Sequence, residues 1–165
     1  PSERCLLDAL VPMVPQLDEN FVQIVQGPDH VVLITDYWRR VVPLDGKPQV
    51  ADTLRTWPGA SRGRWEGETL VIETRNMKGS AKVDTIGHPL SNQAKIVQTF
   101  KRINFGTIEH TFTLTDPKTY TSPWTVKDTW ALDPGTKLLE YACMENNRAL
   151  FEGRIKPFVP PDDVD

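Results

Sequence analysis

The segment 107–115 alternates polar and apolar side chains with a period of two, and this alternation constrains the fold most. One set of positions holds threonine or glutamate, whereas the other holds Ile108, His110, Phe112 and Leu114. Successive side chains of a β-strand point to opposite faces of its sheet. The segment therefore predicts a strand with one face in water and one in a core, and His110 belongs to the core face.

Short segments with strand character follow one another along the chain, joined by links of hairpin length. They cover residues 21–26, 30–37, 39–44, 62–65, 69–75, 95–103, 107–115, 124–132 and 138–144, with a further short one over 149–155. A helical turn is expected only within 51–59. The expected fold class is all-β, an antiparallel up-and-down barrel of about eight or nine strands, similar to calycins and lipocalins, since closure removes sheet edges. A two-sheet sandwich is the alternative.

The 165 residues suffice for one domain with its own core. We expect an irregular N-terminal arm over 1–20, a single barrel domain over 21–156 and a loose acidic tail over 157–165. The polar link 76–94 is a candidate lid. A net charge of −3 offers no basic surface for nucleic acid, and no apolar run approaches the roughly 20 residues of a membrane span. The expected partner is a small molecule, bound by a monomer or homodimer.

Polar side chains fall on the core faces of neighbouring expected strands. Pairing core face with core face across the loop 116–123 places His110 opposite Asp128. The same rule at the next turn places Trp130 opposite Glu140. The other side chains expected in this interior are mainly aromatic, namely Trp124, Phe100, Phe112, Arg102 and, from an early strand of ambiguous orientation, Asp36 and Trp38.

A buried carboxylate without a partner is costly, so Asp128 is expected to pair, to bind water or to be protonated, and His110 is the partner that the register places opposite it. The carboxylate fixes the tautomer of an imidazole that titrates near neutral pH, as general acid–base catalysis requires. In an enzyme, His110 would be the base or acid, Asp128 its orienting group and Glu140 a second proton carrier or polar anchor. The reaction would be a cofactor-free isomerisation, elimination (a lyase), hydration or cyclisation.

Two other interpretations of these residues stay open. The same interior would bind a small apolar or aromatic molecule without turnover, with the tryptophans either stacking on the ligand or filling the core. In the other interpretation the polar groups only fix the strand register, and the domain is a filled interaction module.

The sequence offers no metal-ligand spacing, so we expect neither a metal nor a cofactor. His30 beside a turn and His88 in a loop are expected to be solvated. Cys5 and Cys143 are interpreted either as two buried thiols or as one disulfide.

The segment 61–74, SRGRWEGETLVIET, resembles the signature SRGRWEG(D/E)TLV of a large, uncharacterised group of secreted bacterial proteins. Further matches lie at 2–5, 23–26 with 28–30, 43–46, 116–117 with 123–125, and 140–143. The resemblance implies an extracytoplasmic location, periplasmic or secreted, favours the disulfide between Cys5 and Cys143, and implies a further N-terminal portion. The chain departs from the group at Ala60 and Met144, where the group often has Asp and His. The resemblance implies no activity.

Overall fold

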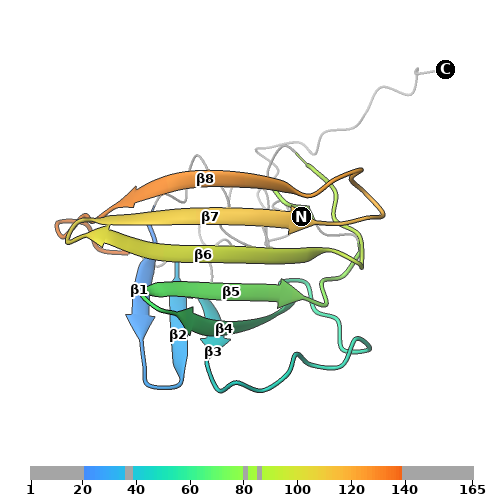
Figure 1. Cartoon of the computed structure of the whole chain (residues 1–165), viewed down its shortest axis with the longest axis horizontal. Coiled ribbons are helices and arrows are strands. Elements are labelled where there is room, and N and C mark those ends of the chain that lie inside the picture. Colours follow the sequence, from blue (N-terminus) through green and yellow to red (C-terminus); the bar gives the residue numbers. More distant parts are fainter. Residues whose placement is uncertain (1–20, 36–38, 80–81, 85–86, 139–165) are drawn as a thin grey trace, which may run out of the picture.

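The computed structural model describes residues 21–35, 39–79, 82–84 and 87–138, which form eight strands in two antiparallel sheets and no helix. The three-stranded sheet contains β1 (Gln23–Gln26), β2 (His30–Ile34) and β3 (Arg39–Pro43). The five-stranded sheet contains β4 (Ala60–Glu66), β5 (Thr69–Arg75), β6 (Lys95–Asn104), β7 (Thr107–Thr115) and β8 (Trp124–Ala131). Neighbouring strands follow one another along the chain, so both sheets are meanders (Figure 1).

The predicted all-β class with antiparallel hairpins is confirmed, and each expected strand up to residue 132 has its counterpart. Residues 51–59 form turns instead of a helical turn. No hydrogen-bonded ladder joins the two sheets in the described part of the chain, so closure of a barrel stays a prediction. The segments 1–20 and 139–165, with the strands and tail expected there, lie outside the described residues. Among the residues that the structure describes, no helix has the length and apolarity that crossing a membrane requires.

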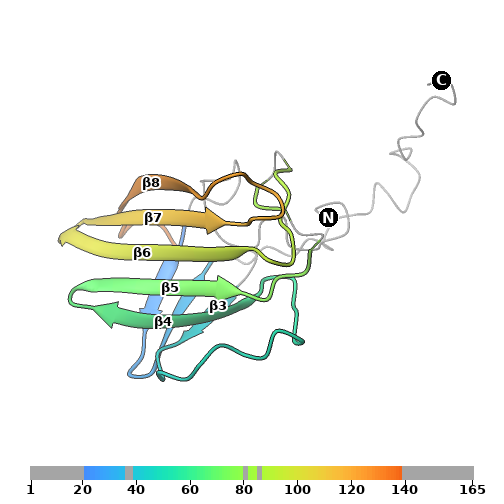
Figure 2. The ribbon, with the colours of Figure 1, turned by 45° about the vertical axis from the view of Figure 1, so that its right-hand side comes forward.

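The strands of the small sheet run across those of the large sheet, behind its β4–β5 side (Figures 1 and 2). The two sheets share one apolar cluster, formed by Val31, Leu33, Val42, Leu70, Ile72 and Phe100. At Gly63 the backbone of β4 comes so close to the small sheet that a Cβ would lie 2.9 Å from a methyl of Val42. Glycine therefore permits this crossing of the sheets.

A second apolar cluster covers the other end of the same face of the large sheet. It is formed by Met77, Val83, Leu90, Ala94, Ile96, Phe112 and Leu114. Four of these residues belong to or border the polar link 76–94, which the sequence suggested as a lid. The described parts of this link thus contribute to the core.

Asp116 fastens this link to the loop between β7 and β8. Its buried carboxylate accepts hydrogen bonds from the backbone N of Ser91 at 2.6 Å and from its Oγ at 2.5 Å. Thr119 Oγ1 and the backbone N of Lys118 donate at 2.9 and 3.2 Å. Burial alone would raise the pKa of Asp116, but these hydrogen bonds outweigh it and hold the pKa below its ordinary value.

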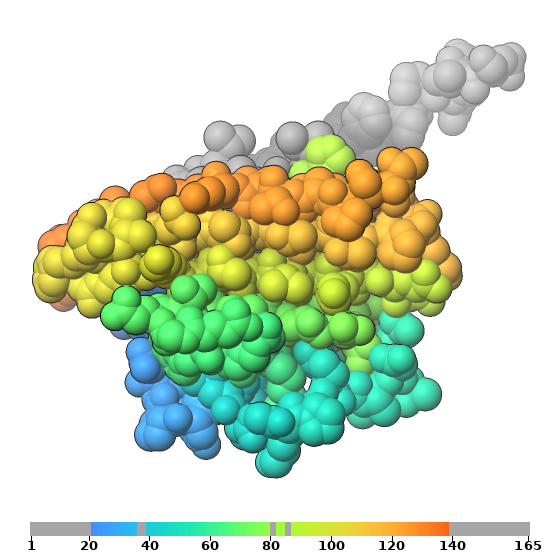
Figure 3. All heavy atoms as spheres, in the orientation of Figure 1, coloured from blue at the N-terminus to red at the C-terminus, as the bar shows by residue number. Residues whose placement is uncertain are grey.

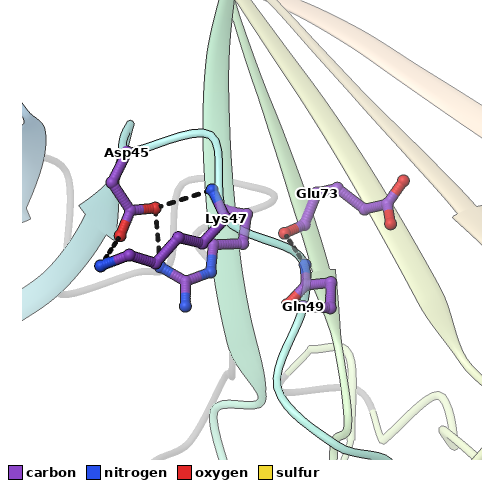
Figure 4. Close-up of polar contacts among 5 residues, drawn as sticks. Asp45, Lys47, Gln49 and Glu73 are labelled. Carbon is purple, nitrogen blue, oxygen red and sulfur yellow. Dashed lines mark hydrogen bonds and ion pairs between the residues drawn. The ribbon is translucent and has the colours of Figure 1, made fainter.

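The link between β3 and β4 lies beside the large sheet and is attached by polar side chains (Figure 4). Asp45 accepts a hydrogen bond from the backbone N of Lys47 and another from Arg62, both at 3.2 Å. Gln49 donates to the backbone carbonyl of Glu73 at 3.1 Å. These contacts position the segment that leads into β4.

Figure 3 shows the face of the large sheet that is turned away from the small sheet. On β7 and β8 this outer face carries mostly threonine, with Glu109 and Lys127. Threonine hydroxyls form cross-strand hydrogen bonds there, between Thr99 and Thr111 at 2.5 Å and between Thr113 and Thr125 at 2.8 Å. The alternation expected for 107–115 is therefore confirmed, and the chemistry of interest lies on the inner face.

Gly59→Ala is expected to destabilise the protein more than Gly67→Ala, although both glycines have a positive φ, 72° and 59°. A Cβ at Gly67 meets nothing within 4 Å, whereas at Gly59 it would lie 2.6 Å from the carbonyl oxygen of Arg75, which belongs to β5. We expect a loss of about 1 kcal/mol for Gly67→Ala, the cost of left-handed backbone, and about 3 kcal/mol for Gly59→Ala. Urea unfolding measures both, and equal losses would contradict this tight contact.

Candidate functional site

Hydrogen-bonded polar side chains cross the inner face of the large sheet, one from each strand. They are Ser61 of β4, Thr74 of β5, Gln98 of β6, His110 of β7 and Asp128 of β8. The register brings them together, since Ser61 pairs directly with Thr74, and His110 with Asp128. Gln98 lies diagonally between the two pairs. Direct and diagonal neighbours on one face of a sheet are within reach of each other.

Arg40 of β3 reaches these residues from the small sheet, and we call all six residues the polar chain. Its Nε donates to Ser61 Oγ at 2.9 Å, its Nη1 to Gln98 Oε1 at 2.5 Å, and its Nη2 to Thr74 Oγ1. No carboxylate of the described residues forms an ion pair with this guanidinium. Desolvation lowers the pKa of Arg40 below its ordinary value, to about 9, so the group is a buried cation at neutral pH.

The hydrogen bonds of the polar chain run in one direction, which Arg40 sets. A guanidinium only donates, so the amide oxygen of Gln98 faces Arg40 and its NH₂ group faces Nε2 of His110, at 3.1 Å. Because that NH₂ also only donates, Nε2 accepts and the proton of the neutral ring sits on Nδ1. Nδ1 then donates to Oδ1 of Asp128 at 2.8 Å. The polar chain thus ends at the carboxylate of Asp128, which accepts a hydrogen bond.

His110 is enclosed by aromatic rings. Only 1% of its surface is exposed, and the centroid of its ring lies 4.6 Å from that of Phe100 and 4.8 Å from that of Trp130. Burial lowers the pKa of His110 below its ordinary value, and the positive charge of Arg40 acts in the same direction, whereas Asp128 opposes both. A neutral imidazole agrees with the direction of the hydrogen bonds.

The polar chain reaches solvent at Asp128, on the inner face of β8. Trp124, Val126, Asp128 and Trp130 alternate along this face, each is partly exposed, and we call them the β8 row. The side chain of Asp128 is 25% exposed. Aromatic rings pack against both indoles. The ring centroid of Trp124 lies 5.9 Å from that of Phe112, and the ring centroid of Trp130 lies 5.4 Å from that of Phe100. The row therefore offers an accessible carboxylate between two rigidly supported apolar rings.

The structure brings most of the predicted site residues together. The register predicted for β7 and β8 is confirmed, because His110 faces Asp128 across the two strands. Phe100, Phe112, Trp124 and Trp130 share the inner face with this pair, as expected. Asp36, Trp38, Glu140, Cys5 and Cys143 lie outside the described residues.

Arg102 was expected in the interior, and this expectation is wrong. The side chain is exposed, donates to the backbone carbonyls of Asn104 and Phe105 at 3.1 and 2.6 Å, and lies over the ring of Phe105. The last four residues of β6 extend past the core, and the pairing with β7 shifts between Arg102 and Asn104. Alternation assigns a face but does not indicate where the core ends.

The remaining histidines lie at the surface, as predicted. The side chain of His30 is 43% exposed and pairs with Asp29 at 2.6 Å, and that of His88 is 54% exposed and pairs with Asp84 at 2.5 Å. In the described parts of the chain, no group of three or more His, Cys, Asp or Glu side chains is arranged to hold a metal ion.

The sequence-based interpretation missed Arg40, the residue that orients the polar chain. Arg40 alternates with Val42, but its neighbour Arg39 alternates in the same way with Val41, so the pattern does not select the buried arginine. Gln98 gave a clearer signal, because it lies between two apolar residues on the core face of its strand.

Comparison with known proteins finds no family model, no curated protein and no solved structure that matches the chain. The resemblance of segment 61–74 to a group of secreted bacterial proteins therefore stays a prediction.

Proposed function

We propose that the domain binds a small, largely apolar or aromatic molecule against the β8 row. The observation that carries this proposal is the partly exposed carboxylate of Asp128 on one face with the partly exposed rings of Trp124 and Trp130. Sites for small molecules are mostly apolar and contain a few polar groups in fixed positions. Here His110 fixes the carboxylate, and aromatic packing fixes the indoles.

The same geometry favours binding over acid–base catalysis. A general base needs a lone pair directed at the substrate. The Nε2 lone pair of His110 accepts a hydrogen bond from Gln98, the Nδ1 proton is donated to Asp128, and the ring is buried. In this arrangement the imidazole acts through the carboxylate that it orients.

A closed barrel and an extracytoplasmic location belong to the same proposal. The two meanders pack around a shared core, as parts of an up-and-down barrel would. The location rests on the resemblance of segment 61–74.

The neutral fluorescent probe N-phenyl-1-naphthylamine tests the proposal. We expect saturable binding to the wild-type protein, and about tenfold weaker binding by Trp130→Leu, since the probe loses an aromatic surface. Trp57→Leu is the matched control, because Trp57 is 42% exposed on the link before β4 and distant in sequence from the row. Circular dichroism would verify that both variants fold. The proposal fails if wild-type protein does not bind the probe saturably, or if both variants weaken binding equally.

A further inference from the structure

Asp128 stands out in the polar chain because it combines a charge with access to solvent. The members between Arg40 and Asp128 are neutral, and the neutral form of His110 leaves the charge of the carboxylate uncompensated by its immediate partner. Oδ1 of Asp128 accepts from His110, and Oδ2 has no hydrogen-bond partner among the described residues. An ionised carboxylate has no proton of its own, so it can only accept further hydrogen bonds.

The nearest charged neighbours along the strands do not neutralise this carboxylate. Lys127 precedes it on β8 but points to the outer face, where its Nζ pairs with Glu109 at 2.7 Å. Arg40 is 7% exposed and is separated from Asp128 by two neutral side chains of the polar chain. Within the ranges that the structure describes, no positive charge therefore pairs with this carboxylate on the inner side of β8.

The flanks of the carboxylate are apolar. Val126 and Trp130 are the next side chains on either side along the same face, each about 7 Å away along the strand. An indole ring attracts a cation through its quadrupole, and a carboxylate pairs with the same cation and accepts its N–H groups. A positively charged N–H donor can therefore pair with the carboxylate of Asp128 and lie against the indole of Trp130 at the same time.

We infer that the ligand carries a primary or secondary ammonium group that donates to Asp128, while its apolar or aromatic body lies against Trp130 and Val126. This inference rests on the proposed small-molecule function and names its ligand class, an apolar amine. A carboxylate ligand does not suit the site, because Asp128 repels it. The buried guanidinium of Arg40 already donates to Ser61, Thr74 and Gln98, away from solvent.

Three compounds with the same aromatic body test the inference: 2-phenylethylamine, 2-phenylethanol and 3-phenylpropionate. Each would compete with N-phenyl-1-naphthylamine for the full chain at pH 7.5. We expect the amine to bind at least tenfold tighter than the alcohol, and the acid to bind most weakly. An acid that competes as well as the amine overturns the inference, and probe binding in that case leaves the proposed function intact. Absence of saturable probe binding overturns the proposed function itself.

Asp128→Asn is the variant that identifies the carboxylate. The asparagine oxygen still accepts from Nδ1 of His110, so the substitution removes the charge and keeps this hydrogen bond. We expect the ratio of amine affinity to alcohol affinity, measured in the same variant, to fall from at least tenfold to about one. Glu109→Gln is the matched control, since it removes one negative charge from the outer face. Equal losses of amine affinity in both variants would point to general electrostatics and overturn the inference.

Discussion

Arg40→Met is expected to lower the free energy of unfolding by about 3 kcal/mol. Methionine keeps most of the hydrocarbon stem but has no N–H groups, so the acceptors of Ser61, Thr74 and Gln98 lose their donor. A buried polar group left unsatisfied costs about 1–3 kcal/mol. Removal of a buried cation also removes its desolvation cost, which offsets part of this loss. Urea unfolding followed by tryptophan fluorescence measures the net effect.

Arg39→Met is the control for this prediction. Arg39 is the neighbouring arginine of the same strand, but it is exposed and points to the opposite face. Its replacement is expected to change the free energy of unfolding by less than about 0.5 kcal/mol. If Arg40→Met is as stable as the control variant, the guanidinium does not hold the polar chain together.

Acidification from neutral pH is expected to destabilise the protein through His110. Burial lowers the pKa of His110 in the folded state below 6.5, so the unfolded state binds a proton at a higher pH than the folded state does. The stability that depends on neutral His110 is therefore complete above about pH 6.5. It decreases as the pH falls below this value, until the lower pKa of the folded state is reached. Protonation also places an N–H against the NH₂ of Gln98, which faces Nε2.

His110→Gln should flatten the pH dependence just below 6.5 and cost about 2 kcal/mol at pH 7.5. Glutamine has both a donor and an acceptor, but it cannot titrate and does not fill the space between the rings of Phe100 and Trp130. His30→Gln and His88→Gln are the controls, because both side chains are at the surface. Urea unfolding at several pH values gives the profiles. A slope that persists in His110→Gln would assign the pH dependence to another group.

The pairing of His110 with Asp128 could be predicted from sequence because it depends on local rules. Strict alternation assigned each side chain to a face, and the hairpin between the strands permitted only core-to-core pairing. The polar outer face, with Thr111 and Thr113, followed from the same rules.

The role of Arg40 could not be predicted from these rules, because it depends on how two sheets pack. Valine occurs on both faces of its strand, so the pattern did not show which arginine is buried. The orientation of Gln98 depends in turn on Arg40, which is 58 residues away in sequence. Arg102 was misplaced because the buried part of β6 ends at Phe100, which belongs to the cluster shared with the small sheet, and alternation along the strand does not indicate this end.

Nitrogen-15 NMR of the His110 side chain at pH 7.5 tests the central claim, which is that each hydrogen bond from Arg40 through Gln98 and His110 is donated in the direction of Asp128. The expected spectrum has a protonated Nδ1 and an unprotonated Nε2, with the Nδ1 proton hydrogen-bonded to Asp128. A proton on Nε2 would contradict the account, because that nitrogen could not then accept from Gln98.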